Sequence, residues 1–167
     1  MGPKAHKQKA PASLRVAVLT VSTSRGLAED KSGHWMNRQA RREGHEVVFH
    51  QVVADNRFEI TRQLAAMIDA QSPDLVLVNG GTGLSPSDVT IEAITPLFKK
   101  ELTAFAPLFS QLSFEEIDSA AIVSRATAGI IKQTAVFCLP GSLTACKLAC
   151  KALIFPEAGH IAMHLRS

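Results

Sequence analysis

The feature that most constrains the fold is the alternation of short apolar segments with amphipathic ones along almost the whole chain. Residues 14–21 and 75–78 are nearly continuous in β-branched and aliphatic side chains, which is typical of strands buried on both faces. Between them, Ile60, Leu64, Met67 and Ile68 recur at the spacing of one helix face. This alternation predicts a three-layer α/β/α sandwich, with a mostly parallel sheet between helices on both faces.

Local signals set the expected boundaries of each segment. Further strands are predicted over 46–53 and 120–123, and a hairpin over 127–131 and 134–139. Helices are predicted from near Trp35 to just before Gly44, after an Asn56 cap, over 90–101 and 105–117, and after Pro140-Gly141. In the last of these, Leu143, Cys146, Cys150 and Leu153 share one face.

Length and charge then limit the organisation of the chain. With 167 residues, 46% hydrophobic and 20% charged, it fits one globular domain. Three of the 18 Lys and Arg residues, Lys4, Lys7 and Lys9, lie in the first thirteen positions, so the rest balances 15 basic against 15 acidic side chains. We therefore expect a flexible basic tail over 1–13, a single domain over 14–167, and no nucleic-acid partner, since nucleic-acid binding needs basic charge on the folded surface.

Cysteine content and hydropathy indicate the compartment. The three cysteines, Cys138, Cys146 and Cys150, are odd in number and have no disulfide-framework spacing, which favours reduced thiols in a cytoplasmic protein. Cys146 and Cys150 have the i, i+4 spacing of a metal-binding pair, but no second pair of ligands exists, so core thiols are expected. No apolar run approaches the roughly 20 residues of a membrane span, and no secretory signal follows the basic start. We expect neither a membrane location nor export.

Small, hydroxylic and acidic residues follow the predicted strands. Ser22 begins one such loop, Asp55 lies in the next, and the segment 79–88 (NGGTGLSPSD) follows the third strand. Later loops contain Ser124-Arg125 and Pro140-Gly141-Ser142. Because ligands of parallel α/β sheets bind beyond the carboxyl ends of the strands, this distribution predicts a binding site at one edge of the sheet.

The run Gly80-Gly81-Thr82-Gly83 is the strongest single motif. Glycines allow a backbone to approach a phosphate closely, and the amides of a turn before a helix bind anions. The run is not a dinucleotide fingerprint, because Pro86 stands where the third glycine belongs, nor a Walker A loop, because no Gly-Lys-Ser/Thr follows. A plain strand-to-helix turn is the alternative.

Asp55 and Asp88 are the candidate acidic residues. Carboxylates from two strand ends are able to share Mg²⁺, which proteins bind through one or two carboxylates together with substrate phosphates. The alternative for Asp88 is a cap on the helix that starts near Val89, and a capping role is also the alternative for Asp55. Ser124 and Arg125 are candidates for contact with an anion, and a surface ion pair is the alternative for Arg125.

Together these loops resemble the MoaB/MogA family of molybdenum cofactor biosynthesis, and its MoaB branch in particular. The matching strings run in order from residue 14 to about residue 156: LTVS (19–22), DKSGH (30–34), GGTGLS (80–85), DVT (88–90), LSFEEI (112–117), SRA (124–126) and LPGS (139–142). Each string alone is weak, but their joint occurrence is specific.

The resemblance implies a trimer or a hexamer of two trimers, and it implies Mg²⁺-dependent adenylylation of molybdopterin. In that reaction the terminal phosphate of molybdopterin attacks the α-phosphate of ATP, giving adenylylated pterin and pyrophosphate. A phosphate monoester has a second pKa of about 6, so the nucleophile is already ionised at neutral pH and needs no general base. This agrees with a set of loops that offers no convincing catalytic histidine.

Motif positions and resemblance together predict two sets of site residues. Asp55 and Asp88 are expected to serve catalysis and Mg²⁺. Phosphate, pterin and nucleotide are expected to bind Ser22, Gly80, Gly81, Thr82, Gly83, Ser124, Arg125, Pro140, Gly141 and Ser142. A non-catalytic pterin-binding or scaffold protein of the same fold is the alternative function. A redox enzyme is disfavoured by the missing dinucleotide fingerprint.

Overall fold

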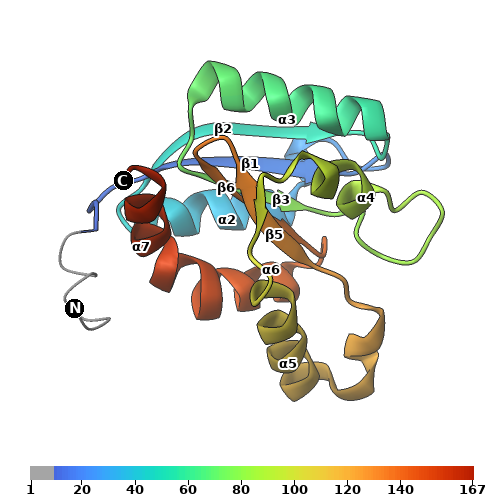
Figure 1. Cartoon of the computed structure of the whole chain (residues 1–167). Helices are drawn as coiled ribbons and strands as arrows, with labels where there is room; N and C mark the ends of the chain where they lie inside the picture. Colours follow the sequence, from blue (N-terminus) through green and yellow to red (C-terminus); the bar gives the residue numbers. More distant parts are fainter. Residues whose placement is uncertain (1–9) are drawn as a thin grey trace.

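The computed structural model describes residues 10–167 and has a sheet of six strands between two helical layers (Figure 1). The strand order is β2-β1-β3-β6-β5-β4. The first four strands in this order, β2, β1, β3 and β6, are parallel to one another. Strand β5 is antiparallel to both of its neighbours, β6 and β4. The strands are β1 (Arg15–Val21), β2 (Glu46–Val53), β3 (Leu75–Asn79), β4 (Lys100–Glu101), β5 (Thr127–Ile131) and β6 (Thr134–Leu139).

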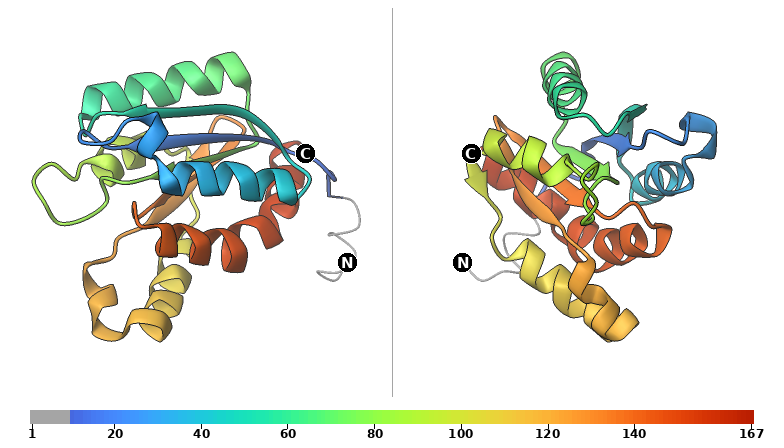
Figure 2. Two further views of the ribbon diagram at one scale, coloured as in Figure 1. Left: turned by 180° about the vertical axis from the view of Figure 1, so that it is seen from behind. Right: turned by 90° about the vertical axis from the view of Figure 1, so that its right-hand side faces the viewer.

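Helices cover both faces of this sheet, as the alternation predicts. On one face lie α3 (Arg57–Gln71) and α4 (Thr90–Ile94); on the other lie α2 (Lys31–Arg42), α6 (Leu143–Ala149) and α7 (Phe155–Leu165), as Figures 1 and 2 show. Two apolar clusters fill the two interfaces, one including Met36, Leu77 and Phe109, the other including Leu64 and Val78. Helix α5 (Phe105–Ile117) projects from the α6 side, away from α3.

Several predicted elements are confirmed. Strand β2, helix α5 and both arms of the β5–β6 hairpin have the predicted bounds. Asn56 caps α3, since its side chain accepts a hydrogen bond from the Glu59 amide, and the predicted α3 face is buried. The central position of β3 follows from its composition, because all five of its residues are buried.

The start of α2 corrects the sequence analysis. The helix begins at Lys31 rather than near Trp35, because the Asp30 carboxylate accepts the Gly33 amide and caps it. A short 3-10 turn, Leu27–Glu29, precedes that cap.

The predicted helix over 90–101 is also wrong after its first turns. Helix α4 ends at Ile94, and Pro96 lies in a 3-10 turn, Thr95–Leu97. The chain then extends into β4, where the Lys99 amide donates to Ile130 O and the Leu102 amide to Ala128 O. Pairing with β5 satisfies backbone groups that a continued helix would have paired internally.

The predicted strand over 120–123 is a 3-10 helix, Asp118–Val123. Its apolar residues do not enter the sheet, and Ile122 is 87% exposed. A short apolar run predicts burial, but no strand within residues 10–167 pairs with this segment.

In the C-terminal region a π-helical turn, Cys150–Ile154, separates α6 from α7. The wider turn rotates the following residues, so that Ile154 is fully buried whereas the predicted Leu153 is only partly buried. Cys146 and Cys150 are core thiols, and burial raises the pKa of the Cys146 thiol to about 12.

The predicted tail, 1–13, lies mostly outside the described residues. Ala10 packs against Gly159 of α7, and Leu14 is buried. Over residues 10–167, no helix has both the length and the apolar character needed to cross a membrane.

Candidate active site

A cleft of about 660 Å³ opens at the carboxyl edge of the central strands. Strands β1, β3 and β6 end level with one another, since Thr20 pairs with Asn79 and Asn79 with Leu139. The loops that follow them, together with the loop after β2, therefore meet at one place. Because β2 and β3 lie on opposite sides of β1, this is the switch point at which α/β sheets bind ligands.

The glycine loop forms the floor of the cleft. Gly80 and Gly81 have φ of +91° and +64°, and a Cβ on Gly80 would lie 2.2 Å from Val21 O. Thr90 fixes the loop from below, because its hydroxyl donates to Gly80 O at 2.7 Å and its amide to Gly81 O at 2.9 Å. Gly141 crosses over Gly80, as a Cβ on Gly141 would lie 3.2 Å from the Gly80 Cα. Only glycine permits both the backbone conformation and the close approach at Gly80.

The Asp55 carboxylate faces this loop. Its Oδ2 atom accepts the Thr23 amide and the Thr23 hydroxyl, each at 2.8 Å. Its Oδ1 atom lies 3.0 Å from where a Gly81 Cβ would sit. One oxygen therefore holds the side chain in place while the other faces the glycine loop.

Asp88 lies at the other end of the loop. Its Oδ2 atom accepts the Ser85 amide at 2.9 Å and lies 2.7 Å from where a Gly83 Cβ would sit. Helix α4 has Val89 at its N-cap position with no side-chain cap. Asp88 thus closes the turn 85–88. It does not cap the helix, so the alternative role of a helix cap is wrong.

Arg125 supports the loop and pairs with a carboxylate. Its Nε donates to Thr82 O at 2.9 Å, and its two terminal nitrogens contact the Glu92 carboxylate at 2.6 and 3.3 Å. The hydrogen bond from Arg125 lowers the pKa of the Glu92 carboxyl. The guanidinium is therefore engaged within the protein, which leaves less of it available to an anion.

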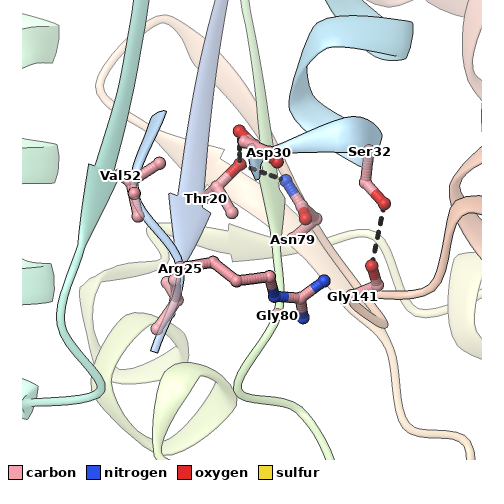
Figure 3. A pocket seen from close by; sticks show the side chains of 10 residues that line it. Thr20, Arg25, Asp30, Ser32, Val52, Asn79, Gly80 and Gly141 are labelled. Atoms are coloured by element: carbon pink, nitrogen blue, oxygen red, sulfur yellow. Dashed lines mark hydrogen bonds between the residues drawn. The ribbon is translucent and has the colours of Figure 1, made fainter. Parts of the chain in front are cut away.

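Arg25 is a site residue that sequence reasoning missed. It lines the cleft and also an adjoining small cavity of about 20 Å³, roughly the room for one water molecule. Figure 3 shows its guanidinium extending toward Gly80 and Gly141. Within residues 10–167 it forms no ion pair, in contrast to Arg125. Its position in the loop after β1 was the only sequence signal.

A buried polar network borders the same small cavity. Asp30 accepts the Thr20 hydroxyl at 2.6 Å, and Thr20 in turn accepts the Asn79 amide at 2.7 Å (Figure 3). Asp30 also contacts His50 Nε2 at 2.8 Å. Burial raises the pKa of Asp30, but hydrogen bonds from His50, Thr20 and Gly33 outweigh burial, so the pKa lies below its usual value. The ionised carboxylate thus joins the ends of β1 and β3 to α2.

The cleft brings together all but one of the predicted site residues. Those lining it are Ser22, Asp55, Gly80, Gly81, Thr82, Gly83, Asp88, Ser124, Arg125, Pro140 and Gly141. Ser142 instead caps α6, accepting the Ala145 amide at 3.2 Å, and lines a neighbouring hollow. Its loop is nevertheless fixed at the site, because Ser32 donates to Gly141 O at 2.8 Å.

The cleft offers carboxylate oxygens but no complete metal cage. In the part of the chain that the structure describes, no three His, Cys, Asp or Glu side chains are grouped to hold an ion. Two carboxylates without further side-chain ligands fit Mg²⁺, which keeps several waters and takes remaining oxygens from substrate phosphates. They do not fit a structural zinc site, which needs nitrogen or sulfur ligands.

Comparison with known proteins gives a consistent result. Residues 17–160 match a family model described as a probable molybdopterin binding domain. The chain is 47% identical to molybdenum cofactor biosynthesis protein B of Bacillus subtilis, over 99% of this chain and 98% of that protein. It is 40% identical to a protein of Pyrococcus furiosus named molybdopterin adenylyltransferase, over 99% of each. A crystal structure of a molybdenum cofactor biosynthesis protein B superposes with a TM-score of 0.90, at 40% identity, over 95% of this chain and 99% of the other.

Proposed function

Because this chain belongs to the MoaB/MogA family of molybdenum cofactor biosynthesis proteins, we propose that it is a molybdopterin adenylyltransferase. The proposed reaction joins the terminal phosphate of molybdopterin to the α-phosphorus of ATP. A phosphate oxygen forms the new P–O bond, the bond to the β-phosphate oxygen breaks, and pyrophosphate leaves with that electron pair. The name of the Pyrococcus furiosus relative supports this activity.

The observation that carries the proposal is that two carboxylates face opposite ends of one glycine loop in a single cleft. Asp55 Oδ1 faces Gly81, and Asp88 Oδ2 faces Gly83. A site built to bind one phosphate through backbone amides alone needs no carboxylates, which repel it. Paired carboxylates beside an anion loop are instead suited to a reaction between two phosphates with a cation between them.

The protein's own residues supply positioning and charge. Amides of the glycine loop are suited to donate to a phosphate, and Thr90 and Arg125 hold that loop rigid from both sides. Arg25 is placed to neutralise negative charge at the junction of the Gly80 and Gly141 loops. No general base is required of the protein, since the attacking phosphate is ionised at neutral pH.

Asp55 and Asp88 are the residues that would hold Mg²⁺. When bound there, the ion would withdraw electron density from phosphate oxygens and offset the charge that develops on pyrophosphate. Hydrogen bonds from the protein alone orient both carboxylates: Thr23 holds Asp55 toward the glycine loop, and the turn 85–88 holds Asp88.

A non-catalytic molybdopterin-binding protein is the second candidate, and one observation favours it. Oδ2 of Asp55 accepts hydrogen bonds from Thr23 in the loop after β1, and Oδ2 of Asp88 accepts one from Ser85 in its own turn. Carboxylates whose only role is to stabilise the loop conformations would accept the same hydrogen bonds. A binder would use the glycine loop without turning over ATP.

The deciding experiment is incubation with molybdopterin and Mg-ATP while pyrophosphate release is followed. We expect release by the wild type and about 10²–10³ times slower release by Asp88→Asn, as for removal of one well-placed electrostatic group. Pterin binding should be nearly unchanged, because an Asn oxygen still accepts the Ser85 amide. Asp69→Asn, an exposed carboxylate on α3, is the matched control. Pterin binding without pyrophosphate release by the wild type would identify the binder.

We also propose that residues 14–167 act as one domain and that the chain assembles as a trimer or hexamer. Exposed apolar side chains support the assembly: Leu108, Phe114 and Ile117 on α5, with Ile122 and Val123 beside them. Val123 reaches the cleft lining, so an interface there would border the site.

A further inference from the structure

Helix α7 carries a pair of facing imidazoles that do not line the cleft. His160 Nε2 and His164 Nε2 lie 3.0 Å apart, and their ring centroids are separated by 4.7 Å. One helical turn earlier, Glu157 Oε2 contacts His160 Nδ1 at 3.1 Å. The three side chains follow at i, i+3 and i+7, which places them along one side of the helix.

The carboxylate fixes which nitrogen of His160 carries the proton. A carboxylate has no proton to donate, so His160 Nδ1 is the donor in the contact with Glu157. His160 Nε2 is then the basic nitrogen, with its lone pair directed toward His164. This carboxylate–histidine arrangement is the outer-shell pattern that orients metal-ligating histidines and raises their basicity.

We propose that His160 and His164 form a binding site for a divalent transition-metal ion such as Zn²⁺, with Glu157 as its outer-shell partner. Two nitrogens at tetrahedral Zn–N distances of about 2.0–2.1 Å are separated by roughly 3.3 Å. The observed 3.0 Å therefore needs only a small ring rotation to admit the ion between the two nitrogens. His164 changes tautomer on binding, because its Nε2 donates to His160 when no ion is present.

Imidazole nitrogens determine which ions bind. They favour Zn²⁺, Cu²⁺ and Ni²⁺, whereas Mg²⁺ prefers carboxylate and water oxygens. Within residues 10–167 the structure shows no group of three or more metal-binding side chains, so this part of the chain supplies two ligands of the proposed site, His160 and His164.

The site is separate from the cleft. The end of α7 is tied to the opposite edge of the sheet, where Arg166 contacts Asp74 at 2.6 Å just before β3 begins. The cleft follows the end of β3. Metal binding on α7 and adenylylation in the cleft can therefore fail independently.

The ion would join two adjacent turns of α7. Gly159 lies within these turns, and glycine is among the least helix-stabilising residues. Its presence is explained by packing, because a Cβ there would lie 3.1 Å from the Ala10 Cβ. A metal bridge between His160 and His164 offsets this weakness, so binding should raise the thermal stability of the protein.

The test is calorimetric titration of the full-length protein, without an affinity tag, with ZnCl₂ in the presence of excess MgCl₂. We expect one ion per chain and at least a tenfold loss of affinity in His160→Gln and in His164→Gln. Glu157→Gln should weaken binding by roughly 10–100-fold, the usual effect of removing an outer-shell partner. His45→Gln is the matched control, since His45 accepts the Leu14 amide and packs on Phe155 instead of a second imidazole.

Copper provides a spectroscopic readout that a loss of folding does not imitate. With one equivalent of Cu²⁺, the electron paramagnetic resonance spectrum should show coupling to two imidazole nitrogens, and to one in His164→Gln. Circular dichroism establishes that each variant is folded. Equal Zn²⁺ affinity in wild type and His164→Gln, displacement of Zn²⁺ by Mg²⁺, or no Zn²⁺ uptake would overturn the proposal.

Discussion

Both donors of Thr23, its amide and its hydroxyl, contact the same Asp55 oxygen, Oδ2, at 2.8 Å. Because Oδ2 is held twice, Oδ1 is left directed at Gly81. Thr23 is thus a positioning residue for a candidate catalytic carboxylate, although it comes from a different strand end.

This relationship predicts the effect of Thr23→Val, which keeps the shape and removes the hydroxyl. We expect kcat for pyrophosphate release to fall roughly 10–100-fold, since a hydrogen bond to a charged group contributes about 1.5–3 kcal/mol. KM should change little, and Thr23→Ser should restore most of the rate. A rate for Thr23→Val equal to that of wild type would remove Thr23 from this role.

The two arginines of the cleft should respond differently to truncation. Arg25→Ala removes a guanidinium that has no ion pair within residues 10–167, and should weaken ATP or pterin binding by about tenfold or more, with the melting temperature unchanged. Arg125→Ala removes the support of Thr82 O and Glu92, and should reduce the free energy of unfolding by about 1–3 kcal/mol. Calorimetric binding and urea unfolding of both variants distinguish the two roles.

The glycine loop should tolerate no side chain at Gly80. We expect Gly80→Ala to reduce the free energy of unfolding by about 2–5 kcal/mol, because a strained φ and a Cβ 2.2 Å from Val21 O act together. Gly44→Ala is the control, since Gly44 has a similar φ of +87° but its Cβ would make only an ordinary contact, 4.0 Å from Ala12 O. Its cost should be only about 1–2 kcal/mol. Equal costs in urea unfolding would show that crowding at Gly80 is not decisive.

The exposed apolar surface on α5 and the following 3-10 helix should mediate assembly. Ile122→Glu places a charge on its most exposed residue and should shift a trimer or hexamer toward monomers in light scattering, without unfolding the chain. Deletion of residues 1–9 is the control and should leave the assembly intact. An unchanged oligomer in Ile122→Glu would place the interface elsewhere.

Acid should destabilise the protein through His45. Burial lowers the pKa of His45, although Glu43 and Asp74 act in the opposite direction. Below a pH of about 6.5, the pKa of histidine in the unfolded chain, the unfolded chain therefore binds this proton more readily than the folded protein does. The free energy of unfolding therefore decreases as the pH is lowered. Urea unfolding at about pH 7.5 and about pH 5.5 should show a smaller pH effect in His45→Gln than in wild type. The reverse order would contradict this assignment.

The sequence by itself determined the elements whose signals are local. The continuous apolar run at Leu75–Val78 predicted the central strand, and the spacing of Ile60, Leu64, Met67 and Ile68 predicted the buried face of α3. The loop motifs predicted which segments meet at the cleft, because parallel strands present their carboxyl ends at one edge. These patterns are local because side-chain periodicity reflects which face of a single element is buried.

Only the tertiary structure decided the contacts between distant segments. Of the two arginines that line the cleft, Arg125 pairs with Glu92. Arg25 has no ion pair among the described residues. The Asp30 carboxylate that caps α2 also contacts His50 of β2, twenty residues along the chain. Ile122 and Val123 are exposed because residues 118–123 form a 3-10 helix instead of a strand of the sheet. Hydrogen-bond partners and burial depend on how whole elements pack, and spacing along one segment carries no record of that packing.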